Sequence, residues 1–127
     1  ATQNEINGEQ ANILVKTGCK IVAEGANMPS TPDAIDVYLK NNIYYGPAKA
    51  ANAGGVATSG LEMSQNSIRM SWSFEETDAK LKGIMKAAYD SSKNAAIEYG
   101  DPMNLQKGAN IAGFMKVARS MLAQGIW

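Results

Sequence analysis

The sequence predicts an α/β fold in which a small parallel strand, helix, strand unit is followed by three long helices. Two apolar runs, residues 20–24 and 43–46, are too short for helices and are separated by one helical segment. This order is typical of a parallel sheet. From Gly55 onward the apolar residues recur at fours and sevens, which is the spacing of packed helices. The chain therefore changes from mixed α/β to wholly helical near its middle.

Signals for helix starts and stops frame the two strands. Asn7 can cap a short helix over residues 8–16, which Gly18 ends. Thr31 can cap a second helix over residues 32–41, whose first turn holds a proline and an acidic residue. Two strands make a very small sheet with exposed edges. Since the chain also lacks an initiator Met, we expect it to be cut from a longer one that supplies partner strands.

Three helices are predicted after the Gly- and Ala-rich stretch. The first covers residues 55–72 and is expected to pack along one apolar face. Ser73 and Glu76 form a capping box for the second, which ends near residue 99 before a Gly-Asp-Pro sequence. The third begins near residue 104 or 107 and ends at residue 124.

Composition excludes several functions. Twelve Lys and Arg balance twelve Asp and Glu, so no net field draws the chain to nucleic acid or to an anionic membrane. Histidine is absent, which removes imidazole bases and His-ligated metals, and we predict no metal site. No apolar run approaches the roughly 20 residues of a membrane span. The single cysteine, Cys19, is expected to be a buried structural thiol in a reducing compartment, so we expect a cytoplasmic protein.

The stretch GPAKAANAGGVATSGLEMSQN, residues 46–66, is a candidate ligand site. It leaves the end of a predicted strand and enters a helix, where open α/β sheets bind ligands, and its small residues let a flat group approach the backbone. Asn52 carries an amide donor and acceptor that could match a nicotinamide carboxamide, or it could only fix a turn. Asn27, after the first strand, is similarly a ribose contact or a turn residue.

Four further side chains deserve notice, and three of them, Ser59, Glu24 and Lys49, have two interpretations each. Val56 and Ser59 fall in the first turn of the predicted helix, where free N–H groups favour an anion, and the Ser59 hydroxyl suits a carboxylate substrate. Serine in a first turn is also common for local reasons. Glu24 could be a general base or a structural partner, and Lys49 could contact a ligand or simply be solvated.

The chain resembles the carboxyl-terminal part of the hexameric glutamate dehydrogenases over essentially its whole length. The broader amino-acid dehydrogenase family shares parts of this pattern, whereas the unbroken AGGVATSGLEMSQN block favours the glutamate branch. The stretches that carry the resemblance are ATQNEI, VAEGANMP, GPAKAANAGGVATSGLEMSQN, the SW pair before the capped helix, GANIAGFMKVA and MLAQGIW.

The resemblance implies an enzyme of two lobes around a cleft. Residues 1–54 would form the later half of a Rossmann-like lobe that binds NAD or NADP, and residues 55–127 a helical carboxyl-terminal segment that packs on it. The parent enzyme, a homohexamer, would interconvert L-glutamate with 2-oxoglutarate and ammonia. Its catalytic Lys and Asp belong to an amino-terminal lobe outside this chain, so no catalytic residue is assigned here and the chain alone is expected to be inactive.

The resemblance also assigns roles to six residues. Those expected to contact the cofactor are Asn52 at the nicotinamide carboxamide, Asn27 at the neighbouring ribose, and Ala1 and Thr2 in the loop that edges the cofactor. Those expected to contact glutamate are Val56, along its side chain, and Ser59, at its distal carboxylate. The competing hypothesis is a non-catalytic nucleotide-binding or helical assembly module.

Overall fold

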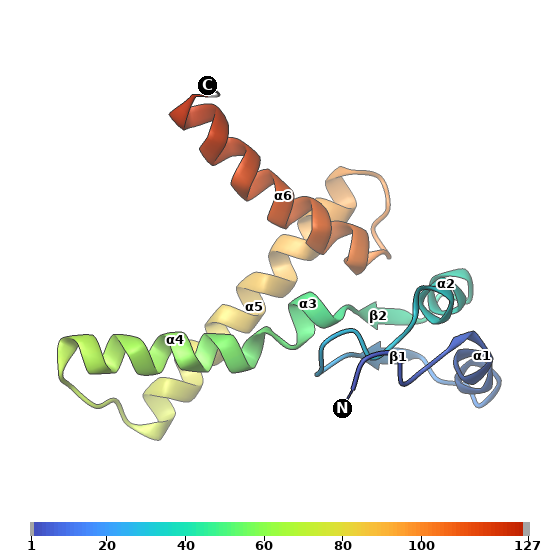
Figure 1. Cartoon of the computed structure of the whole chain (residues 1–127), viewed down its shortest axis with the longest axis horizontal. Coiled ribbons are helices and arrows are strands. Elements are labelled where there is room, and N and C mark those ends of the chain that lie inside the picture. Colours follow the sequence, from blue (N-terminus) through green and yellow to red (C-terminus); the bar gives the residue numbers. More distant parts are fainter. Residues whose placement is uncertain (1, 126–127) are drawn as a thin grey trace.

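A computed structural model describes residues 2–125 as a small α/β unit joined to an extended set of helices (Figure 1). The α/β class and the predicted order of elements are confirmed. Most ends lie within two residues of their predicted positions, apart from a short helix in the Gly- and Ala-rich stretch and an earlier end to the helix that follows. In chain order the elements are α1 (Gly8–Lys16), β1 (Ile21–Ala23), α2 (Pro32–Lys40), β2 (Tyr44–Gly46), α3 (Ala48–Ala51), α4 (Ala53–Ile68), α5 (Phe74–Glu98) and α6 (Leu105–Gln124).

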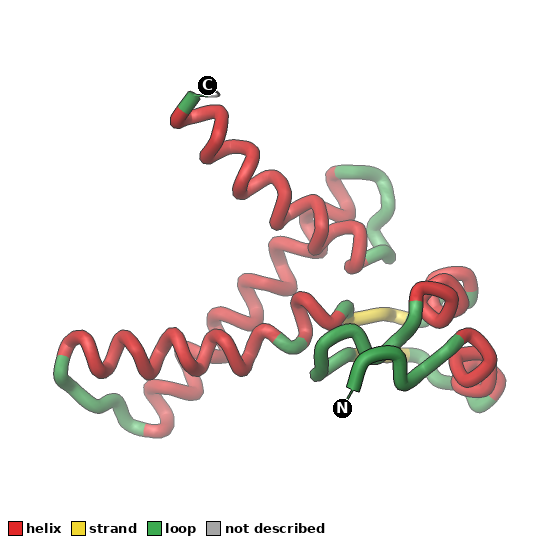
Figure 2. The backbone as a smooth tube through the Cα atoms, in the orientation of Figure 1, coloured by secondary structure: helices red, strands yellow, loops and turns green. Residues whose placement is uncertain are grey.

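Strands β1 and β2 are parallel neighbours, as the sequence predicts, with Val22 opposite Tyr45. An isolated parallel bridge between Ile6 and Ser30 adds a further short pairing beside them. Helices α1 and α2 lie side by side at one end of the molecule, and the strands lie between this pair and the long helices (Figure 2). The hydrophobic core sits in this unit and consists of Ala11, Ala34, Tyr38, Ile43 and Tyr45.

Local hydrogen bonds start α1 where the sequence predicts. The Asn7 side chain accepts the Gln10 amide N–H at 3.0 Å, and the Gln10 side chain accepts the Asn7 N–H at 2.9 Å. The Gly8 N–H donates to Asp33 Oδ2 at 2.8 Å, which ties the start of α1 to that of α2. Hydrogen bonds from Thr31 and from the Gly8 amide lower the pKa of Asp33, so this link is kept into acidic solution.

Helix α4 ends earlier than its apolar pattern predicts. Arg69 adopts a left-handed conformation (φ 56°), and the Trp72 N–H donates to the Gln65 side chain at 2.7 Å, so the backbone turns towards α5 instead of extending α4. The expected packed face is also incomplete, because Val56, Met63 and Met70 are exposed. Only one side of α4 meets α5, and no residue of α4 is fully buried.

Helices α5 and α6 carry the rest of the helical part. The predicted capping box of α5 is present: Ser73 Oγ accepts the Glu76 N–H at 3.1 Å, and Glu76 Oε2 accepts the Ser73 N–H at 2.7 Å. The chain then turns back, and α6 packs against the last turns of α5 before projecting away from the molecule (Figure 1). Within residues 2–125, no helix combines the length and hydropathy required to cross a bilayer.

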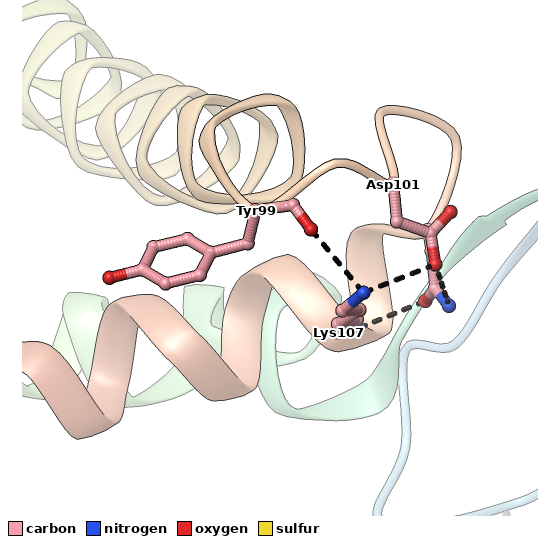
Figure 3. Close-up of polar contacts among 4 residues, drawn as sticks. Tyr99, Asp101 and Lys107 are labelled. Atoms are coloured by element: carbon pink, nitrogen blue, oxygen red, sulfur yellow. Dashed lines mark hydrogen bonds and ion pairs between the residues drawn. The ribbon is translucent and has the colours of Figure 1, made fainter.

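Polar contacts hold the turn between α5 and α6 (Figure 3). Lys107 Nζ donates to the Tyr99 carbonyl at 3.4 Å and lies 3.8 Å from Asp101 Oδ2. Asn104 caps α6 by accepting the Lys107 N–H at 2.9 Å, and its own amide donates to Asp101 at 3.1 Å. Gly100 makes this turn with a φ of 76°, a conformation that favours glycine. The direction in which α6 leaves α5 is therefore set locally.

Candidate functional site

A cavity of about 680 Å³ opens where β1 and β2 end, at the edge of the sheet that the sequence predicts for ligands. Five segments surround it: the amino-terminal loop, the loop after β1, the start of α2, the end of β2 with α3, and the first turn of α6. Its lining includes Asn4, Asn27, Tyr45, Ala48, Asn52 and Gln106. Its size is that of a small-molecule site.

Two of the predicted site residues meet at this cavity. Asn52 Nδ2 donates to Asn27 Oδ1 at 2.6 Å, although the residues are 25 positions apart in the sequence. The pairing uses one donor of Asn52 and the acceptor of Asn27. Asn52 Oδ1 and the Asn27 side-chain NH₂ group take no part in this bond and are available to a ligand. The cavity lining thus has an acceptor on Asn52 beside a donor on Asn27.

The backbone around Asn52 differs from the open loop that the composition predicts. Residues Ala48–Ala51 form the single-turn helix α3, and Asn52 both ends this helix and begins α4. The free amides of α4 are consequently those of Ala53, Gly54 and Gly55. The first-turn position predicted for Ser59 is wrong, since Ser59 lies in the second turn, and the argument from free N–H groups does not apply to it.

The two predicted substrate residues lie elsewhere on the surface. Val56 is 80 % exposed and Ser59 is also exposed; their spacing of three positions places them on one face of α4. Neither lines the cavity with Asn52. The structure does not bring these four candidate residues into one cavity, and the substrate roles of Val56 and Ser59 stay predictions.

The predicted amino-terminal contacts are placed only in part. Thr2 is exposed, and its N–H and hydroxyl donate to Glu5 Oε1 at 2.7 and 3.0 Å. These hydrogen bonds lower the pKa of Glu5. Thr2 does not line the cavity, whereas its neighbours Gln3 and Asn4 do. Ala1 lies outside the described residues, so its predicted contact is not placed.

Glu24 is buried, with 4 % of its surface exposed, and both of its carboxylate oxygens accept hydrogen bonds. It accepts the Ser30 N–H at 3.1 Å, the Tyr45 hydroxyl at 2.5 Å and the Ala48 N–H at 3.1 Å. The structural interpretation of Glu24 is thereby favoured over that of a general base. Burial, followed by the hydrogen bond to Glu24, raises the pKa of Tyr45, so its hydroxyl remains a donor.

Several cavity residues escape sequence reasoning. Asn4 has a φ of 58°, and its N–H donates to the Met28 carbonyl at 3.0 Å. The only hint in the sequence is that asparagine tolerates this left-handed conformation better than most residues do. Gln106 lies in the first turn of α6, far along the chain from the other lining residues, and no local sequence pattern identifies it. Lys49, left open between two interpretations, is exposed, lines the cavity and donates to Asn110 Oδ1.

The cavity residues fit the nicotinamide end of a dinucleotide. Pro47 and Ala48 form an apolar wall, and the Asn27 and Asn52 amides supply polar partners. A flat ring can lie against such an apolar wall while its polar substituent meets the amides. Among residues 2–125, no group of three or more cysteine, aspartate or glutamate side chains could hold a metal ion.

This arrangement, with polar side chains around a cavity at the carboxyl ends of parallel strands, defines an α/β ligand-binding protein. The model of the Glutamate/Leucine/Phenylalanine/Valine dehydrogenase family matches residues 1–125, and the chain belongs to that family. It is 59 % identical over 98 % of its length to the NADP-specific glutamate dehydrogenase of Giardia intestinalis. It is also 59 % identical over 99 % of its length to a glutamate dehydrogenase of Bacteroides thetaiotaomicron.

Solved structures agree with this assignment. The glutamate dehydrogenase of Plasmodium falciparum matches the whole chain with a TM-score of 0.95 and 54 % identity, although the match covers 27 % of that chain. The present chain likewise spans 28 % of the length of the Giardia and Bacteroides relatives. The resemblance read from the motifs is therefore confirmed at the level of the family.

Proposed function

We propose that the chain forms the nicotinamide-facing part of the cofactor site in an NAD(P)-dependent glutamate dehydrogenase. The reaction of such an enzyme is the reversible oxidative deamination of L-glutamate to 2-oxoglutarate and ammonia, for which the bound nicotinamide supplies the hydride acceptor. The observation that carries the proposal is the Asn27–Asn52 pair at the cavity of about 680 Å³. The names of the relatives, NADP-specific or NAD(P)-specific, support the choice of cofactor.

Within this proposal, Asn52 binds the nicotinamide carboxamide and Asn27 binds the adjacent ribose. Thr2 and Ala1 edge the cofactor. Residues 1–54 belong to the Rossmann-like nucleotide-binding lobe, and residues 55–127 pack on it as the helical carboxyl-terminal segment. Val56 and Ser59 share one exposed face of α4, which is free to meet glutamate in the cleft between two lobes.

Acid–base chemistry in this proposal depends on a Lys and an Asp outside the 127 residues. The chain has no histidine, and the buried carboxylate of Glu24 already accepts three hydrogen bonds. Exposed apolar side chains on α6, among them Leu122 at 71 % and Phe114 at 69 %, suit coverage by the rest of a subunit. Because the acid–base groups lie outside it, we propose that the 127-residue chain alone has no turnover. For the parent enzyme we propose a homohexamer in the cytoplasm.

A chimaera tests the proposal. These residues replace the matching stretch of the Giardia intestinalis enzyme, and NADPH binding and turnover are measured. Asn52→Ala should raise the KM for NADPH about tenfold, since it removes a paired polar contact, and should change the KM for 2-oxoglutarate far less. Asn66→Ala is the control, because Asn66 is exposed on the same helix and away from the cavity.

Three outcomes would contradict the proposal. The first is a folded chimaera that does not bind NADPH. The second is an equal effect of the Asn52 and Asn66 variants on the KM for NADPH. The third, sustained glutamate turnover by the isolated 127-residue chain, would place the acid–base groups within it. Binding of NADPH by a folded chimaera without any turnover would instead favour the non-catalytic nucleotide-binding module.

A further inference from the structure

We infer that Glu24 is a positioning residue of the cofactor site, which sets the placement of Asn27 and Asn52 relative to each other without itself touching the cofactor. The inference rests on the proposed function. Glu24 lines the same cavity as both asparagines, yet its side chain is buried and both of its carboxylate oxygens accept hydrogen bonds from protein donors. Its effect on a ligand therefore passes through the two loops that it joins.

Glu24 closes the loop that carries Asn27. This loop leaves β1 after Ala23, and the Ser30 N–H returns to Glu24 Oε1 at 3.1 Å. Asn27 is midway between the two ends of this closure. A side chain at the centre of a loop pinned at both ends loses much of its conformational freedom before a ligand arrives.

Glu24 also holds the helix that ends at Asn52. Its Oε2 accepts the N–H of Ala48, the first residue of α3, at 3.1 Å. One helical turn later, the Asn52 N–H donates to the Ala48 carbonyl at 2.9 Å. A continuous series of hydrogen bonds thus runs from Glu24 through Ala48 to Asn52.

The chemistry of this position requires a carboxylate. Three donors converge on Glu24: two backbone amides and the Tyr45 hydroxyl. An ionised carboxylate offers two acceptor oxygens and no donor, so it satisfies all three. A glutamine of the same shape must turn its NH₂ group towards at least one donor. Glu24→Gln therefore breaks the junction with little change in volume.

The experiment compares Glu24→Gln with Tyr38→Phe in the chimaera. Tyr38 is buried in the hydrophobic core, and its hydroxyl lies 3.3 Å from Ser30 Oγ, but Tyr38 does not line the cavity. The readouts are the Kd for NADPH by fluorescence titration, hydrogen exchange of the Ser30 and Ala48 amides without cofactor, and the midpoint of unfolding. For Glu24→Gln we expect a Kd raised about tenfold and faster exchange at both amides. For Tyr38→Phe we expect a Kd within about twofold of the parent.

A purely structural role gives a different result, and that result overturns the inference. Glu24→Gln would then lower the midpoint of unfolding, as Tyr38→Phe does, while the Kd for NADPH stayed at the parental value. If Glu24→Gln does not fold, Tyr45→Phe decides. Tyr45 also lines the cavity, so the Kd is read together with amide exchange. A Kd raised about threefold with faster exchange at Ser30 and Ala48 supports the inference, and a Kd or an exchange rate that stays at the parental value overturns it. Loss of NADPH binding by the unsubstituted chimaera would refute the proposed function itself, so the two failures are distinguishable.

Discussion

Replacement of Gly108 by alanine should separate two helices that now touch. Gly108 lies in the first turns of α6, packed directly on α5. A Cβ at this position would lie 2.0 Å from the Ser92 carbonyl oxygen and 2.9 Å from the Ala96 Cβ. The nearest obstacle is a backbone atom inside a helix, so it cannot rotate away. The helices must therefore move apart by at least about 1 Å, and the packing around the crossing is lost with them.

The magnitude follows from two opposing effects. Overpacking a well-packed contact costs about 3 kcal/mol at the upper end of the usual range, which a clash with backbone justifies. Alanine is better than glycine inside a helix by about 1 kcal/mol. We expect Gly108→Ala to lower the free energy of unfolding by about 2 kcal/mol. At about 4 °C per kcal/mol for a chain of this size, the Tm should fall by about 8 °C.

Urea unfolding of the 127-residue chain, followed by circular dichroism, measures this change against a control on the same helix. A Cβ on Gly113 would meet no atom within 4 Å. Gly113→Ala should therefore stabilise the chain by up to about 1 kcal/mol, through helix propensity alone. The two substitutions are chemically identical and should act in opposite directions. Equal shifts of the unfolding midpoint in both variants would refute the close contact between α5 and α6.

Two further predictions concern a cap and a titration. Ser73→Ala removes the acceptor of the Glu76 N–H and should cost about 1 kcal/mol in urea unfolding, whereas Ser120→Ala, an exposed helical control, should change stability by less than about 0.5 kcal/mol. Equal effects would discount the capping box. The hydrogen bond to the Tyr89 hydroxyl raises the pKa of Tyr44 from 10.0 to about 12. Because the folded state holds this proton more tightly, its contribution is complete below pH 10 and is lost as the pH rises towards 12. Unfolding midpoints across this range should fall less steeply for Tyr44→Phe; parallel curves would contradict the assignment.

Local signals in the sequence determined the class of fold and most element ends. The Asn7 and Ser73 caps act on amides three residues away, so they are readable without knowledge of the fold. The two short apolar runs and the helical spacing after Gly55 likewise depend on neighbours along the chain. The same local reasoning singled out Asn27 and Asn52 as strand-end residues. It failed at Ser59, because the single-turn helix α3 lets α4 begin at Ala53.

Only the tertiary structure decided how the site is assembled. The hydrogen bond between Asn27 and Asn52, the three donors on Glu24 and the arrival of Gln106 join segments that are distant in the sequence. The tertiary structure also decided which part of the apolar face of α4 is exposed. A helical period shows that a face is apolar, but it does not show which neighbour covers that face. Caps and periods are short-range properties of the chain, whereas a cavity exists only where long-range packing places separate segments together.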